Sequence, residues 1–155
     1  MSRKKKFLLV IFILLLTIQV VQPAKNKNNQ VSAADISKTL QVPAEIQKTL
    51  ENSCYDCHSN NTRYPWYTYI QPFGWFLNSH ITEGKKDLNF SEFSSYSRRR
   101  QISKFRAMLS QINDDEMPLQ SYILIHTDAK LNTREKTQLT QWINKTIDSL
   151  SVNKK

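Results

Sequence analysis

Residues 54–58 read Cys54-Tyr55-Asp56-Cys57-His58, and these two cysteines are the only ones in the chain. The spacing C-x-x-C-H is typical of covalent c-type haem attachment. Two intervening residues let one helical turn present both sulfurs to the two vinyl groups of one porphyrin edge. His58 follows directly and is expected to be an axial ligand of the iron. The segment therefore predicts one covalent haem c, held by Cys54, Cys57 and His58.

Three other interpretations of these cysteines fit the sequence less well. A thioredoxin-like dithiol needs a strand followed by a helix, and that context is missing around residues 54–58. A zinc site needs four ligands, and Cys54, Cys57 and His58 are too crowded to supply three of them. A disulfide between the two cysteines would close a very small loop and stabilise little. Haem attachment is therefore the leading interpretation.

The second axial ligand of the iron stays open at this point. Met117 precedes Pro118 in a loop after a basic helix, where its side chain can point inward, and it is the first choice. Met108 lies on the apolar stripe of that helix and is expected to pack in the core. His80 or His126 could instead give bis-histidine ligation. An empty sixth position is the remaining alternative.

Residues 1–22 have the pattern of an export signal. Basic residues 3–6 precede an apolar run from Phe7 to Val21, broken only by Thr17 and Gln19. This run is short for a spanning helix, which needs about 20 residues. Because no strong cleavage site follows, a signal peptide and an uncleaved signal anchor both stay open. The rest of the chain is expected in the periplasm, or anchored to the inner membrane and facing the periplasm.

The charge of the chain is concentrated at its N-terminus. Six of the 22 Lys and Arg residues lie within the first 30 positions, which leaves 16 basic residues against 13 acidic ones. The basic character is therefore mainly a topology signal, and with no nucleic-acid-binding motif we expect no nucleic-acid partner. Residues 23–40 begin with Asn, Lys and Gln without apolar periodicity and are expected to form a flexible linker.

Residues 41–150 are expected to form one small all-α domain. Apolar residues recur at helical spacing, and the chain has only two glycines, which disfavours a turn-rich β fold. Helices are expected to begin near Pro43, Pro72, Tyr96 and Asn132. Asn132 and Glu135 have the spacing of a capping box. Only residues 122–125 could pass for a strand, and this run is too short to decide.

The residues around the motif are rich in aromatic side chains and carry several cations. The aromatic residues, expected to form a haem wall, are Tyr55, Tyr64, Trp66, Tyr67, Tyr69, Phe73, Trp75 and Phe76. Arg63, Lys85 and Lys86 could pair with haem propionates, although a solvated charge is the default for each. Residues 98–100 are three arginines, expected to form a solvated helix face that could dock an acidic redox partner.

In combination, these motifs resemble the bacterial haem-binding domain family, which is related to cytochrome c. The resemblance covers about residues 40–150 and is carried by residues 54–62, 64–67, 80–81, 83–85, 88–92 and 116–118, and by His126, Ala129, Leu131, Glu135 and Trp142. It implies a cytochrome c-like helical domain wrapped around one haem, bound through Cys54, Cys57 and His58, with Met117 as distal ligand. Ordinary small cytochromes c often have Gly after the histidine and before the distal Met, where this chain has Ser59 and residues 114–116.

The expected function is non-enzymatic. The leading interpretation is a one-electron carrier or haem-binding module that acts with redox partner proteins the sequence does not identify. The alternative is a haem-based peroxidase, or a gas or redox sensor, in which the sixth iron position is open. Ready binding of carbon monoxide by the reduced protein would favour that alternative.

Overall fold

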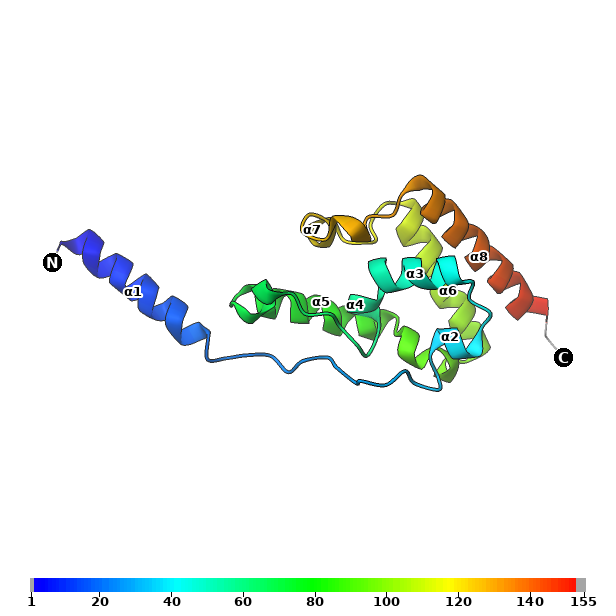
Figure 1. The fold of residues 1–155 in the computed structure, drawn as a ribbon, viewed down its shortest axis with the longest axis horizontal. Helices are drawn as coiled ribbons and strands as arrows, with labels where there is room; N and C mark the ends of the chain where they lie inside the picture. The colour runs from blue at the N-terminus through cyan, green and yellow to red at the C-terminus, as the bar shows by residue number, and fades with distance from the viewer. Residues whose placement is uncertain (1, 153–155) are drawn as a thin grey trace.

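The computed structural model describes residues 2–152, and within this range the regular secondary structure is helical apart from one isolated β-bridge (Figure 1). The predicted all-α class is therefore confirmed. The elements are α1 (Arg3–Ile18), α2 (Ile36–Thr39), α3 (Ala44–Ser53), α4 (Tyr55–His58), the 3₁₀-helix η1 (Trp66–Tyr69), α5 (Phe73–Asp87), the 3₁₀-helix η2 (Phe90–Ser95), α6 (Arg98–Asn113), α7 (Gln120–Ile123), the 3₁₀-helix η3 (Thr127–Ala129) and α8 (Thr133–Val152).

The local start signals in the sequence predicted the beginnings of α3, α5, α6 and α8 within about two residues. Pro43 and Pro72 are the N-caps of α3 and α5. At α8 the backbone N–H of Asn132 donates to Glu135 Oε2 and the N–H of Glu135 donates to Asn132 Oδ1, both at 2.9 Å. This reciprocal pair is the expected capping box. Residues 122–125, the possible strand, belong to α7 and the turn after it, where the Ile123 N–H donates to the Leu119 carbonyl.

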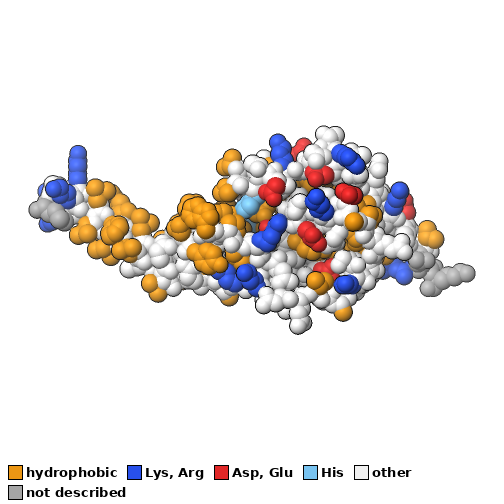
Figure 2. All heavy atoms as spheres, in the orientation of Figure 1, with side chains coloured by type: hydrophobic (Ala, Val, Ile, Leu, Met, Phe, Trp, Pro, Cys, Tyr) orange, Lys and Arg blue, Asp and Glu red, His pale blue; other side chains and the backbone are white. Residues whose placement is uncertain are grey.

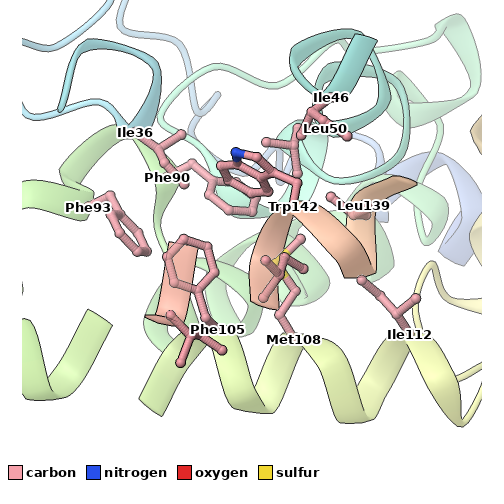
Figure 3. Close-up of a cluster of buried hydrophobic side chains, with 12 residues drawn as sticks. Ile36, Ile46, Leu50, Phe90, Phe93, Phe105, Met108, Ile112, Leu139 and Trp142 are labelled. Atoms are coloured by element: carbon pink, nitrogen blue, oxygen red, sulfur yellow. The ribbon is translucent and has the colours of Figure 1, made fainter. Parts of the chain in front are cut away.

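The main hydrophobic core lies where α8 packs between α6 and α3, and buried residues of α2 and η2 complete it (Figure 3). Its centre is a row of aromatic rings. The Phe93 and Phe105 ring centroids lie 5.0 Å apart, and Trp142 packs edge-on against Phe105 at 5.6 Å. Met108 is buried in the same cluster, as its place on the apolar stripe of α6 predicted. This core holds α3, and thereby the residues that follow it, in a fixed position.

Part of the segment predicted as a flexible linker is packed against the domain. Asn26 Nδ2 donates to the Ser59 carbonyl at 2.8 Å, and Lys27 forms the isolated β-bridge with Asn61. Ile36 is fully buried in the core. The chain therefore contacts the domain well before position 41. The physical reason is that Asn side chains satisfy loop backbone groups here, while one apolar residue of a polar segment fills the core.

The N-terminal helix α1 extends away from the rest of the molecule (Figure 1). None of its residues is buried, and its apolar side chains are exposed all along its length. Between residues 2 and 152, no helix combines the length and the apolar character that crossing a membrane would require.

Candidate functional site

The C-x-x-C-H segment forms one helical turn directly after α3. Cys54 ends α3, and α4 consists of the four residues Tyr55–His58. The backbone N–H groups of Cys57 and His58 both donate to the Cys54 carbonyl, at 3.1 and 2.9 Å. Both thiols are free and partly exposed. As a result, Cys54, Cys57 and His58 all line one cavity of about 180 Å³.

The His58 ring is oriented by the backbone at the end of α5. Its Nδ1 lies 2.9 Å from the Leu88 carbonyl oxygen. A carbonyl can only accept, so Nδ1 carries the proton and Nε2 keeps the lone pair that a metal would use. Burial lowers the pKa of His58, which favours the neutral ring. Leu88 is extended and ends α5, so its carbonyl is available for this contact.

Gly84 allows α5 to lie directly against the turn that carries the cysteines. A Cβ atom at this position would lie 2.8 Å from the Cys57 carbonyl oxygen and 3.2 Å from Cys57 Cβ. Any side chain would therefore push α5 away from α4. Gly84 was counted in the sequence only as one of two glycines and as part of the family resemblance. No role for it was predicted, because this contact joins residues 27 positions apart in the chain.

The carboxylate of Asp56, between the two cysteines, links the turn to α7. Asp56 is 7% exposed. Tyr122 Oη donates to its Oδ2 at 2.6 Å, while the backbone N–H and Nε of Arg63 donate to its Oδ1 at 2.9 and 3.3 Å. Burial and the nearby Asp56 raise the pKa of Tyr122. The sequence analysis missed Asp56 and Tyr122 as site residues. An acidic residue between two expected haem ligands was the available signal for the first.

Three cavities share lining residues and surround the turn. They measure about 430, 180 and 360 Å³, and we call them together the cleft. The smallest shares Cys57 and Tyr122 with the first, and Cys54 and His58 with the third. The thiols of Cys54 and Cys57 and the imidazole of His58 therefore all lie along the cleft.

Met117 lines the two parts of the cleft that also contain Cys54 and His58. Its backbone N–H donates to the Gln111 carbonyl at 3.2 Å, which holds the loop against the end of α6. The structure thus brings the first-choice distal residue and the expected axial histidine to the same cavity.

A left-handed residue turns the chain between α6 and Met117. Asp115 has φ of 56°, a conformation that glycine adopts most readily and that Asp tolerates better than most residues. Lys136 Nζ lies 2.8 Å from its Oδ1. Asp115 therefore occupies the turn where the sequence analysis noted that a glycine is absent, and an ion pair with α8 holds it there.

The family model described as the haem-binding domain matches residues 13–145 of the chain. The chain belongs to the haem-binding domain family. This finding makes haem the cofactor and confirms the family predicted from the motifs. Neither the search of curated proteins nor the search of solved structures found a match.

The two histidines considered as alternative ligands occupy different positions in this haem-binding domain. His80 lines the 180 Å³ cavity that contains His58, and its Nδ1 lies 2.8 Å from the Phe76 carbonyl. His126 lines only the 430 Å³ cavity. Both of its ring nitrogens are in hydrogen bonds, with Tyr67 Oη and with the Tyr122 carbonyl, each at 3.1 Å. His80 is thus the histidine that lines the same cavity as Met117 and His58, and it is the alternative to Met117 as the second axial ligand.

The thiols of the haem-binding domain do not have the character of a redox dithiol. Burial and the neighbouring Cys57 raise the pKa of Cys54 to about 12. Burial and Asp56 raise the pKa of Cys57 to about 11. A disulfide oxidoreductase instead needs a thiol whose pKa is lowered, so that thiolate is present near neutral pH. Across residues 2–152, no group of three or more His, Cys, Asp or Glu residues is arranged to hold a metal ion.

The aromatic residues predicted as a haem wall fall into separate groups. Tyr67, Phe73 and Phe76 line the 430 Å³ cavity, whereas Tyr55 stacks on Phe90 at 5.3 Å. The remaining members do not line this cavity.

The cations near the haem-binding cleft have protein partners. Arg63 pairs with Asp56, Lys85 Nζ donates to Asn26 Oδ1 at 2.6 Å, and Lys86 lies 3.8 Å from Glu83. The three arginines at 98–100 are exposed, and the guanidinium of Arg100 lies over the Tyr96 ring at 4.8 Å.

Proposed function

We propose that this domain binds one haem covalently, as haem c, through thioethers from Cys54 and Cys57. His58 Nε2 would be an axial ligand of the iron. The observation that carries the proposal is the His58 ring, whose Nδ1–H is held by the Leu88 carbonyl while both thiols line the same cavity. A second-shell acceptor of this kind fixes the tautomer and orientation of a ligating histidine.

The residues of the cleft fit such a group. The cleft is lined mainly by apolar side chains, and an apolar surrounding suits a porphyrin and tunes the potential of its iron. Met117 shares cavities with His58 and is the proposed distal ligand, since a thioether completes the histidine–methionine pair of cytochromes c.

The function that we propose is one-electron transfer, with haem supplying the reversible iron couple. The protein contributes two fixed axial side chains and an apolar cleft. When both axial positions are filled by protein, the site favours electron transfer over binding of an external ligand. Its redox partners would be proteins, and the exposed arginines at 98–100 form one candidate contact for an acidic partner.

We place this activity outside the cytoplasm. The basic residues 3–6 and the apolar helix α1 support export through segment 1–22, which would either be removed or hold the chain at the periplasmic face of the membrane. A c-type attachment motif in an exported chain is consistent with the compartment in which such haem is joined.

The first experiment is a pyridine haemochrome spectrum of protein expressed with a c-type maturation system, after acid–acetone extraction. We expect haem to stay with the protein and to give the α-band of a haem whose two vinyl groups are saturated. Cys54→Ser and Cys57→Ser should each shift this band toward that of a haem with one free vinyl group. Complete extraction of haem from the unaltered protein would contradict covalent attachment.

A second experiment compares two methionines near the cleft. Met117→Ala should remove the iron–sulfur charge-transfer band of the ferric protein and allow the reduced protein to bind carbon monoxide. Met108→Ala is the comparison variant, because Met108 also lines the 360 Å³ part of the cleft but is buried in the core, and its loss should leave both properties unchanged. If Met117→Ala has no spectral effect, His80→Ala should be measured next, and the assignment of Met117 would be wrong.

A further inference from the structure

A second apolar surface lies outside the cleft, where α1 meets the domain. It consists of five exposed residues, Val20, Val21, Trp66, Tyr69 and Ile70, which we call the junction face. Their side chains are 84%, 62%, 75%, 54% and 44% exposed. None of them lines any part of the cleft. Bound haem would therefore leave this surface uncovered.

Hydrogen bonds fix the end of α1 to the domain at this face. Gln19 Nε2 donates to the Gln71 carbonyl at 3.1 Å, and the Gln71 N–H donates to Gln19 Oε1 at 2.8 Å. Gln22 Nε2 donates to the Tyr69 carbonyl at 3.2 Å, and Trp75 Nε1 donates to the Val21 carbonyl at 2.8 Å. These hydrogen bonds hold residues 19–22 in place against the domain. The exposed apolar surface of α1 therefore continues into that of the domain.

The aromatic residues of the junction face point to the same side. In a 3₁₀-helix, side chains three positions apart lie one above the other. Trp66 and Tyr69 are the first and last residues of η1, so their rings share one side. Tryptophan and tyrosine are enriched where a membrane meets water, because their rings combine an apolar body with a polar edge.

The two chain segments that form the junction face carry charges of one sign. The two chain segments that form it, residues 1–34 and 57–82, contain no Asp or Glu. Lys25 Nζ lies over the Tyr69 ring at 4.0 Å and over the Tyr64 ring at 4.3 Å, with Lys27 near the same Tyr64 ring. Figure 2 shows hydrophobic side chains over the end of the domain that faces α1, while acidic side chains lie further along it. An aromatic surface with lysines and without carboxylates is complementary to anionic lipid headgroups.

We propose that the junction face rests on the headgroup region of an anionic bilayer into which α1 inserts. The domain then lies on the membrane surface in a fixed orientation, with α1 and η1 in contact with lipid together. This inference rests on the proposal that segment 1–22 holds the chain at a membrane. A flexible spacer would hold the domain away from the membrane, whereas the proposed arrangement places the domain in direct contact with lipid.

The test uses the full chain in vesicles of phosphatidylcholine and phosphatidylglycerol, with a photoreactive benzoylphenylalanine at one position at a time. Trp66→benzoylphenylalanine and Tyr69→benzoylphenylalanine probe the junction face. The same substitution at Val152, exposed at the far end of α8, is the matched control. Substitution at Leu14 reports whether α1 is in lipid. Haem absorbance and helical circular dichroism check that each variant is folded.

We expect lipid adducts at positions 66 and 69 to be about tenfold more abundant than at position 152, because aromatic side chains at a membrane interface lie at the level of the headgroups. If position 14 gives lipid adducts and positions 66 and 69 give no more than position 152, the junction face does not contact lipid. The proposal that α1 inserts in the membrane would then be kept. If positions 66 and 69 instead form cross-links to a second copy of the chain, the face is a protein interface. If position 14 gives no adducts, the membrane attachment itself is wrong and the inference fails with it.

Discussion

Two halves of the domain differ in how completely protein covers their apolar side chains. In the closed half, formed by α6 and α8, the Phe105 ring is 1% exposed. In the open half, formed by α5 and α7, Phe76 and Ile125 are 56% and 60% exposed and border the cleft. A small domain has little apolar surface to leave uncovered. The core between α6 and α8 is completed by its own side chains, although α6 also lines the 360 Å³ part of the cleft, whereas apolar side chains of α5 and the segment after α7 stay exposed along the cleft.

The largest effect on stability is expected from Phe105→Ala in the closed half, compared with Phe76→Ala in the open half. Phe105→Ala should lower the free energy of unfolding by about 4 kcal/mol with or without haem, because it empties a closed core. Phe76→Ala should cost the haem-free protein less than about 0.5 kcal/mol, since its ring is exposed there. Urea titrations of haem-free and haem-loaded protein measure both. Similar losses for the two variants without haem would remove the distinction between the halves.

A smaller effect is expected where the open half touches the C-x-x-C-H turn. Gly84→Ala should cost about 2 kcal/mol, because the new methyl group would overlap the Cys57 carbonyl and displace α5. The haem content after maturation should fall as well. Ser79→Ala, at an exposed position of the same helix, is the matched control and should change stability by less than about 0.5 kcal/mol. Equal behaviour of the two variants would mean that α5 is not held closely against α4.

The link between the turn and α7 should depend on pH. Tyr122→Phe should cost about 1.5 kcal/mol at neutral pH, because it removes a hydrogen bond to the buried Asp56 carboxylate. An unfolded tyrosine ionises near about pH 10, whereas the pKa of native Tyr122 is higher. Its stabilisation is therefore complete below that pH and declines as the pH rises further. Urea titrations on both sides of pH 10 should show the difference between protein and variant shrinking; a constant difference would contradict this account.

The smallest effect is expected at the start of α8, in the closed half. Asn132→Ala removes one partner of the capping box and should cost about 1 kcal/mol. Because α8 is part of the closed half, the cost should be the same with and without haem. Thermal unfolding of both forms measures it, with Asn144→Ala on the exposed side of α8 as control. A loss seen only in the haem-loaded form would indicate that α8 also depends on the cofactor.

The sequence predicted the parts of this molecule that depend on neighbouring residues. Pro43 and Pro72 mark helix starts, and Asn132 with Glu135 forms a cap within four positions. The pentapeptide at 54–58 predicted haem through its own spacing. Each of these signals acts over a few residues and can be read without knowing the fold.

The sequence did not predict contacts between distant segments. The Leu88 carbonyl that orients His58, and Tyr122, which binds Asp56, are 30 and 66 positions away from their partners. Ile36 was assigned to a linker because its neighbours are polar, yet it is buried in the core. Residues 122–125 are apolar and brief, and such a run does not distinguish a strand from a turn of helix. Tertiary packing decides all of these positions.

The hydrogen bond from His58 to Leu88 depends on the length of α5, because that length decides where the Leu88 carbonyl lies. The helix has 15 residues, touches Cys57 through Gly84, and ends one residue before the carbonyl that holds the ring. One inserted residue between these two points would turn that carbonyl by about 100° and move it by about 1.5 Å. Nothing else in α5 would need to change for the imidazole to lose its support. The helix therefore sets the spacing between its contact with Cys57 and the carbonyl that orients His58.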